Sequence, residues 1–284
     1  MTSCEKDFPR AGVRLIAFDL DGTLLNSNKE LTPASFAALA RAAEAGIEIV
    51  PATGRFLNAI PEAIRALPFL RYAITVNGAR VVHIPRDFSI ARAEIPWEQA
   101  LEIMSHLDGL SVPYDCFMED WGWMTREYWE RAEAFAFDEH YLKMIRTLRT
   151  PVDDLKAFVR ARRRNVQKIQ CFTWDMDLRA ELLRALSKAF PGVVASSSIP
   201  NNVEINDARA HKGEALRKLA DYLGISMSRT LAFGDGLNDL TMIQAAGIGV
   251  ATRTGYQEAL DAADFVTSGC DEDGVAAGIE RFCF

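Results

Sequence analysis

The sequence predicts an α/β protein, in which a parallel-sheet core is interrupted by an inserted α+β module. Three observations support this prediction. Short apolar runs alternate with amphipathic helical repeats near both ends of the chain, as is typical of βαβ units. Polar, glycine-containing segments directly follow several of these runs. From about Pro85 to Asn202 the alternation gives way to a segment rich in aromatic and basic residues.

The first segment predicts strands and helices in βαβ order. Residues 13–18 form a compact apolar run followed by a glycine turn, which is typical of a buried parallel strand. Thr32 suits a helix N-cap, Pro33 suits the first helical position, and Gly46 ends the helical repeat. A second helix is expected around 60–67, with strands at 47–52, 72–76 and 81–83, the last two joined by an Asn-Gly turn.

The middle third predicts the inserted module. Leucines spaced along one helical face between 178 and 190 predict a helix that stops at Pro191-Gly192. Strands are expected at 166–174, 193–197 and 203–205. The expected domains are a core in residues 1–84 and 203–284 and a module in residues 85–202.

Two clusters in this module have both a functional and a structural interpretation. Aromatic side chains between Trp121 and Phe137 could stack a sugar, nucleoside or pyridine ring, but packing within a small module is favoured. Arginines between Arg160 and Arg164 could bind an anionic substrate or nucleic acid, but a solvated helix end is favoured.

The last segment returns to the βαβ pattern. A helix is expected over residues 213–223, ended by Gly224. A strand at 230–233, a helix at 242–246 and a strand at 248–251 follow.

Composition narrows the class of protein. The net charge of -7 over 284 residues argues against a nucleic-acid or membrane-surface binder. Five scattered cysteines without a CxxC pair predict reduced thiols in a cytoplasmic protein. No apolar signal segment opens the chain, and no uncharged run is long enough to span a bilayer. No pattern predicts an oligomeric state.

Chemically reactive side chains follow several of the predicted strands. Asp19 and Asp21 are separated by one residue on an extended segment, so they point to the same side. Because ligands bind at the carboxyl ends of parallel strands, we expect the pair to share one edge of the sheet with the other candidates. These are Thr53 with Gly54, Lys212, Asp235, Asn238 and Asp239.

The charges of this set predict a metal. Four carboxylates and one ammonium sum to -3, and one Mg²⁺ brings the sum to -1. We therefore expect a Mg²⁺ site formed by Asp19, Asp21 (through its backbone carbonyl), Asp235 and Asp239, with one carboxyl protonated.

The same residues have predicted catalytic roles. Asp19 is the expected nucleophile, forming an aspartyl-phosphate. Asp21 is the expected general acid and then base, for which neighbouring carboxylates would have to raise its pKa. Thr53 and Lys212 are expected to bind phosphate oxygens, and Asn238 to donate a hydrogen bond to the same group.

At this point the chain resembles phosphatases of the haloacid dehalogenase (HAD) superfamily. The resemblance rests on the blocks FDLDGT, ATGR, HKGEAL and GDGLND, in this order. The position of the insert, together with Asn77-Gly78-Ala79 and the DEDGV run at 271–275, is similar to Cof-type (subfamily IIB) members with a C2 cap. The chain departs from that pattern at Thr252–Gly255, Cys270 and His211.

The resemblance implies a Rossmann-like core with a mobile cap and hydrolysis of a small phosphomonoester. Sugar phosphates, nucleotides and pyridoxal phosphate are the substrate classes it implies. A phosphotransferase of mutase type would use the same aspartate pair, and a non-catalytic phosphometabolite-binding protein could keep the fold. A dehalogenase is disfavoured by Asp21, and no lysine of the insert is identified as the Schiff-base residue of a phosphonatase.

Overall fold

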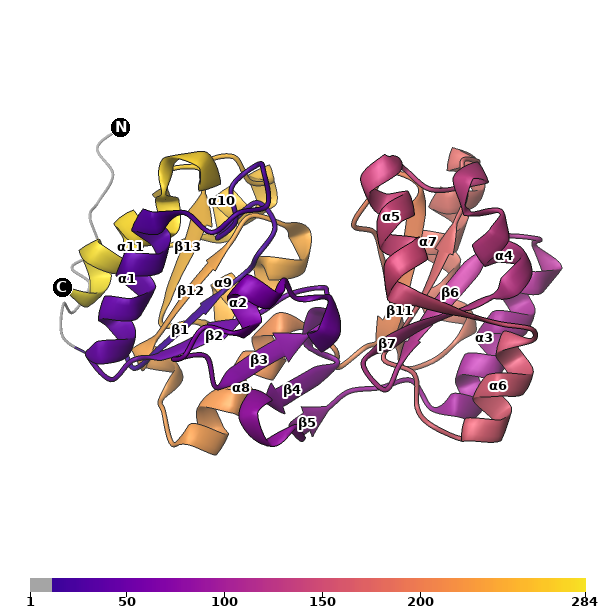
Figure 1. Cartoon of the computed structure of the whole chain (residues 1–284), viewed down its shortest axis with the longest axis horizontal. Coiled ribbons are helices and arrows are strands. Elements are labelled where there is room, and N and C mark those ends of the chain that lie inside the picture. Colours follow the sequence, from indigo (N-terminus) through magenta and orange to yellow (C-terminus); the bar gives the residue numbers. More distant parts are fainter. Residues whose placement is uncertain (1–11) are drawn as a thin grey trace. The chain divides into compact units, whose positions relative to one another are not determined.

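The computed structural model describes residues 12–284, which form two compact units (Figure 1). The core unit holds the chain up to Arg55, Ile60–Arg92 and His211–Phe284, and the inserted unit holds Phe56–Ala59 and Ala93–Ala210. The long segment of the inserted unit, Ala93–Ala210, begins and ends later in the chain than the expected insert at residues 85–202. The reason is strand pairing, because residues 88–92 pair in the core unit and residues 202–207 pair in the inserted unit.

The core unit is built on a parallel sheet in the order β14-β13-β12-β1-β2. Its strands are β1 (Leu15–Phe18), β2 (Glu48–Pro51), β12 (Thr230–Gly234), β13 (Ile248–Thr252) and β14 (Phe265–Thr267). A parallel bridge between Ala52 and Ile74 joins β2 to a second, antiparallel sheet. That sheet contains β3 (Tyr72–Thr75), β4 (Arg80–His83) and β5 (Phe88–Arg92). The predicted α/β class is confirmed.

Helices cover the core sheet where the sequence supplies caps and apolar faces. Thr32 caps α1 (Pro33–Glu44) by accepting from the amide of Ser35 at 3.1 Å. Gly224 ends α8 (Lys212–Leu223) with a positive φ of 66°. The other helices are α2 (Glu62–Arg65), α9 (Leu240–Ala245), α10 (Gln257–Ala262) and α11 (Gly274–Cys283). The helix expected around 60–67 is shorter than predicted and follows a 3-10 turn.

The inserted unit is a six-stranded sheet in the order β10-β11-β9-β6-β7-β8. Its strands are β6 (Tyr114–Met118), β7 (Trp121–Thr125), β8 (Arg149–Val152), β9 (Lys168–Phe172), β10 (Val193–Ser196) and β11 (Asn202–Asp207). The strand pairs are antiparallel except β7 with β8. Its helices are α3 (Trp97–Gly109), α4 (Arg126–Glu130), α5 (Glu139–Leu148), α6 (Leu155–Arg162) and α7 (Met176–Ala189).

Short 3-10 helices occur in both units. They are Leu57–Ala59, Val76–Gly78, Ile84–Arg86, Ala132–Ala134, Met227–Arg229, Leu237–Asp239 and Cys270–Glu272.

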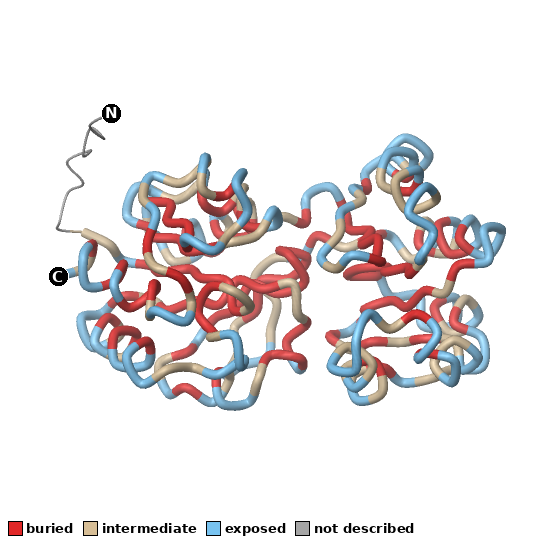
Figure 2. The backbone as a smooth tube through the Cα atoms, turned by 90° about the horizontal axis from the view of Figure 1, so that it is seen from above, coloured by how far each residue is buried: buried red, intermediate tan, exposed pale blue. Residues whose placement is uncertain are grey.

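Burial follows the same plan in both units. In Figure 2 the strands are largely buried, while the outer faces of the helices are exposed. One face of the inserted sheet packs with α3, α6 and α7 into an apolar core. The core unit has a separate apolar core around β1, β2 and α8. Because apolar burial contributes roughly 25 cal/mol per Å², each unit is stabilised by its own core.

Members of the two clusters of the insert make structural contacts, whereas Phe137 is exposed. The Trp123 and Phe158 rings lie 4.4 Å apart by centroid, against the apolar core of the insert. Arg160 and Arg162 lie in the last turn of α6, and Arg162 pairs with Glu119 at 2.9 Å.

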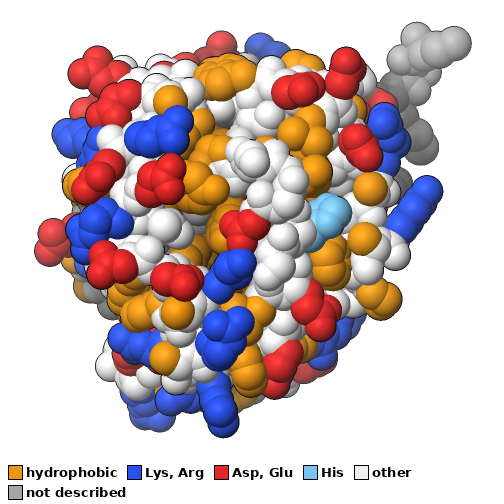
Figure 3. All heavy atoms as spheres, turned by 90° about the vertical axis from the view of Figure 1, so that its right-hand side faces the viewer, with side chains coloured by type: hydrophobic (Ala, Val, Ile, Leu, Met, Phe, Trp, Pro, Cys, Tyr) orange, Lys and Arg blue, Asp and Glu red, His pale blue; other side chains and the backbone are white. Residues whose placement is uncertain are grey.

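Among residues 12–284 no helix is both long and apolar enough to cross a bilayer. On the face shown in Figure 3, acidic and basic side chains are interspersed.

Candidate active site

The carboxyl ends of β1 and β12 bring acidic residues together. The two strands pair in parallel, and the Asp19 amide donates to the carbonyl of Phe233 at 3.0 Å. Asp19 therefore follows β1 beside the turn that carries Asp235 and Asp239. Carboxylate oxygens of Asp19, Asp235 and Asp239 all lie within 4.8 Å of one another. The three groups offer the oxygen donors that a hard divalent cation prefers.

Lys212 is the buried cation of this cluster. It opens α8, and its side chain is 0% exposed. Its Nζ lies 2.6 Å from Oδ1 of Asp19 and 2.5 Å from Oδ1 of Asp239. The two carboxylates raise the pKa of Lys212 against the opposing effect of burial, so the ammonium stays charged.

Asp239 holds the acidic turn in shape. Its Oδ2 accepts from the backbone amides of Asp235 and Gly236 at 3.0 and 2.9 Å, while Oδ1 binds Lys212. Its side chain is fully buried. Asp239 thus binds the Asp235 backbone and the Lys212 ammonium at the same time.

Asp235 is the more accessible member of the acidic turn. Its Oδ1 accepts from the Thr23 hydroxyl at 2.6 Å. Burial raises the pKa of Asp235 to about 6, against the lowering effect of that hydrogen bond. Burial likewise raises the pKa of Asp19 to about 7, although Lys212 opposes the rise. One carboxyl is therefore expected to be protonated in the metal-free site near neutral pH, as the charge sum predicts.

Asp21 has a different environment from the one the sequence suggests. Arg55 holds its carboxylate with two hydrogen bonds, Nε to Oδ2 at 2.8 Å and Nη2 to Oδ1 at 2.9 Å. Lys29 adds an ion pair at 3.1 Å. Burial alone would raise the pKa of Asp21, but Arg55 and Lys29 lower it to about 2. The general-acid role requires a raised pKa of Asp21, whereas in this structure the Arg55 guanidinium lowers it.

The structure groups the same three side chains that the sequence analysis names as carboxylate ligands of the metal. Within residues 12–284, the carboxylates grouped closely enough to share one ion are those of Asp19, Asp235 and Asp239. The Asp21 carboxylate is turned to Arg55, which leaves its backbone carbonyl as the predicted ligand.

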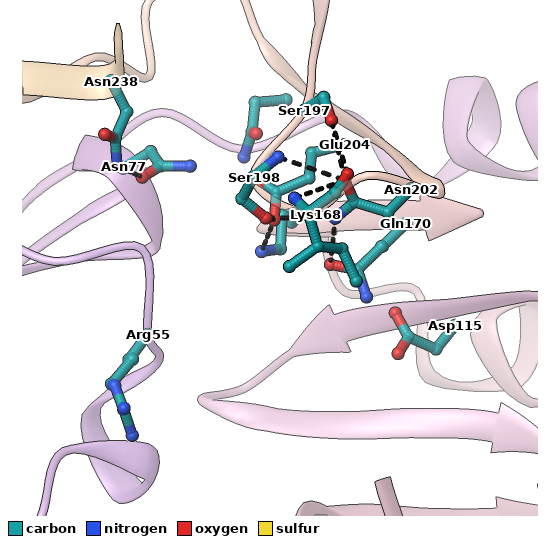
Figure 4. Close-up of polar contacts among 12 residues, drawn as sticks. Arg55, Asn77, Asp115, Lys168, Gln170, Ser197, Ser198, Asn202, Glu204 and Asn238 are labelled. Carbon is teal, nitrogen blue, oxygen red and sulfur yellow. Dashed lines mark hydrogen bonds and ion pairs between the residues drawn. The ribbon is translucent and has the colours of Figure 1, made fainter. Parts of the chain in front are cut away.

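The phosphate-binding candidates follow β2 and β12. Thr53 is buried, its amide donates to the Ile74 carbonyl at 2.9 Å, and its Oγ1 accepts from the Arg55 amide at 3.2 Å. The Asn238 side-chain amide donates to Oδ1 of Asn77 at 3.1 Å, and the two lie side by side in Figure 4. The sequence analysis named Asn77 in the hairpin turn and in the Cof-type resemblance but did not place it in the site, although its position after a strand end was a signal.

Two of the departures from the family pattern, Thr252 and His211, lie next to residues of the candidate site. Thr252 is buried, and its hydroxyl donates to the Gly22 carbonyl at 3.4 Å. The Tyr256 amide donates to the Asp235 carbonyl at 2.8 Å. His211 is the N-cap of α8, since its Nδ1 accepts from the Glu214 amide at 3.2 Å.

The inserted unit has a buried polar network that the sequence analysis missed. Lys168 on β9 pairs with Glu204 on β11 at 2.8 Å, and Ser198 donates to the same carboxylate at 2.9 Å (Figure 4). Arg149 pairs with Asp115 at 2.9 Å, both almost fully buried. Asp115, Lys168 and Glu204 alternate along their strands with residues of the apolar core, so the buried polar side chains were hidden in short, mixed sequence runs.

The raised pKa values predict how pH changes the stability of the metal-free protein. Asp19 and Asp235 hold protons in the folded state that they release when unfolded, because their pKa values are raised from 3.8 to about 7 and about 6. The stability that these groups contribute is present below pH 3.8 and is lost as pH rises through 6 to 7. In EDTA, we expect the free energy of unfolding to fall between pH 5 and pH 8.

Denaturant unfolding at the two pH values measures this effect. Mg²⁺ should restore stability more at pH 8 than at pH 5, because a cation compensates ionised carboxylates. In Asp235→Asn the fall should be smaller. A metal-free wild type as stable at pH 8 as at pH 5 would contradict the prediction.

The chain is similar in sequence and in structure to known hydrolases and phosphatases. A family model described as haloacid dehalogenase-like hydrolase matches residues 16–279. The chain is 27% identical over 282 residues to the 5-amino-6-(5-phospho-D-ribitylamino)uracil phosphatase YcsE of Bacillus subtilis, covering 95% of this chain and 96% of that protein. It is 31% identical over 238 residues to the HMP-PP phosphatase of Cronobacter sakazakii, covering 84% and 83%. A solved haloacid dehalogenase-like hydrolase from B. subtilis has a TM-score of 0.80 at 29% identity, over 95% of this chain and 99% of that chain.

Proposed function

We propose, because the chain belongs to the haloacid dehalogenase-like hydrolase family, that it hydrolyses a small phosphomonoester with Asp19 as nucleophile. The chain is an enzyme of the phosphatase class. One observation carries the assignment of the nucleophile: the Asp19 carboxylate is bound by the buried Lys212 and lies beside Asp235 and Asp239. This arrangement orients one carboxylate oxygen and offsets charge around it.

The reaction proceeds in two steps. An Asp19 oxygen attacks phosphorus and the ester P–O bond breaks, which leaves an aspartyl-phosphate and an alcohol whose oxygen takes a proton from Asp21. Water then attacks the phosphorus, Asp21 takes back a proton, and inorganic phosphate leaves as the Asp19–phosphorus bond breaks. Lys212, Thr53 and Gly54 bind phosphate oxygens, and Asn238 donates a hydrogen bond to the same group.

Arg55 adds a condition to the first step. Because its ion pair holds Asp21 ionised, Asp21 carries a proton only after the guanidinium has moved off it. We therefore propose that Arg55 controls the protonation state of the Asp21 carboxyl group.

The metal in this proposal is Mg²⁺. The carboxylate oxygens of Asp19, Asp235 and Asp239 lie in one small volume, and with the Asp21 carbonyl as a further ligand they are the hard donors that this ion prefers. When bound, it would offset the charge of the incoming phosphate. The proposed substrates are small phosphorylated metabolites of the sugar phosphate, nucleotide or pyridoxal phosphate class.

Phosphate release from a panel of such phosphomonoesters tests the proposal. We expect turnover with Mg²⁺ and none with EDTA, and the preferred compound would define the substrate class. Parallel reactions with an added sugar acceptor would detect phosphoryl transfer. Mg²⁺-independent turnover, or transfer without hydrolysis, would contradict the proposal.

A further inference from the structure

The turn at 76–78 is strained and lies against the candidate phosphate-binding residues. Val76, Asn77 and Gly78 have φ values of 49°, 57° and 101°. Positive φ suits glycine and is tolerated by asparagine, but it is an outlier for a β-branched valine. Val76 is also fully buried. Such strain persists only where surrounding contacts hold the backbone in this conformation. The contacts of the turn therefore show which part of the site it supports.

The backbone of the turn is bound to the segment that carries Thr53. The Val76 amide donates to the Arg55 carbonyl at 2.9 Å, and the Asn77 amide donates to the Thr53 carbonyl at 3.0 Å. A Cβ added at Gly78 would lie 2.6 Å from the carbonyl oxygen of His211, which precedes Lys212. The turn therefore packs against the start of α8 as well as against the Thr53 segment.

The Asn77 side chain extends this contact to the turn after β12. Its Oδ1 accepts from Nδ2 of Asn238 at 3.1 Å, and a Cβ added at Gly54 would lie 3.0 Å from the same oxygen. Asn77 is buried, whereas Asn238 is exposed. A carboxamide has two N–H bonds in one plane, so fixing one of them fixes the direction of the other.

We propose that Asn77 is a positioning residue for phosphate binding, acting through Asn238. It holds the Asn238 amide so that the second N–H of Nδ2 donates to the bound phosphate. The inference rests on the proposed function, since it assumes that Asn238 contacts the phosphate. A neutral amide suits this position better than a carboxylate, which would add another negative charge beside the incoming dianion.

Asn77→Gly is the informative variant, because glycine keeps the positive φ while it removes the side chain that accepts from Asn238. With Mg²⁺ present, we expect the dissociation constant of inorganic phosphate to rise about tenfold, as for a lost hydrogen bond to a charged group. Asn238→Ala should have at least this effect. In the double variant the losses should not add, because one residue acts through the other. Asp87→Gly is the matched control, since Asp87 also has positive φ (43°) but is exposed, and phosphate affinity should not change.

A second measurement uses the wild-type protein and does not depend on how the variants fold. The ¹⁵N side-chain amide signal of Asn238 should shift when inorganic phosphate is added. Unchanged phosphate affinity in folded Asn77→Gly, additive losses in the double variant, or an unmoved Asn238 signal at saturation would overturn the inference alone. A wild type that does not bind phosphate would overturn the proposed function together with it.

Discussion

Asp19→Asn is expected to abolish phosphate release, lowering kcat on the order of 10⁴-fold or more, as removal of a catalytic nucleophile does. The amide has no ionised oxygen to attack phosphorus, while its size is nearly unchanged. Lys212 keeps its ion pair with Asp239, so the variant should fold. Steady-state assays on the preferred substrate measure the loss, and reductive trapping of the aspartyl-phosphate should label wild type and not the variant.

Asp87→Asn is the control for this prediction. Asp87 is exposed and pairs with Arg80 outside the acidic cluster, so the same chemical change there should leave kcat unchanged. Activity of Asp19→Asn within tenfold of wild type would show that another group is the nucleophile.

Lys212→Met is expected to have the largest effect on stability. The substitution leaves the Asp19 and Asp239 carboxylates buried without their shared cation. Removing one partner of a buried ion pair costs about 3–5 kcal/mol of unfolding free energy. Denaturant unfolding in EDTA at pH 8 measures this loss. At pH 5 the loss should be smaller, because Asp19, with a pKa of about 7, takes up a proton and neutralises the unpaired charge.

Lys218→Met separates this effect from a general effect of the substitution. Lys218 lies on the same helix and is only partly buried, so its replacement should change stability by about 0.5 kcal/mol or less. A Lys212→Met protein as stable as Lys218→Met at pH 8 would contradict the ion-pair account.

The family and the overall plan were predictable because they depend on local patterns. An apolar run followed by Asp19 predicts a buried strand with a carboxylate at its end, and the same holds for the run before Asp235. Parallel strands present their carboxyl ends at one edge, so local assignments were enough to group Asp19, Thr53 and Asp235. The insert was predictable because the alternation of strand and helix patterns stops there. Its borders were not, because they depend on which strands pair with each other.

The pairing of individual side chains was decided by the tertiary structure. Asp21 and Arg55 are 34 residues apart, and Asn77 and Asn238 are 161 apart. Nothing in the local pattern of either partner specifies the other, because such contacts arise only when packed strands fix both backbones. The low pKa of Asp21 and the support of Asn238 by Asn77 follow from these contacts. The sequence alone thus determined which groups gather at the sheet edge, whereas packing determined which of them bind one another and in which charge state.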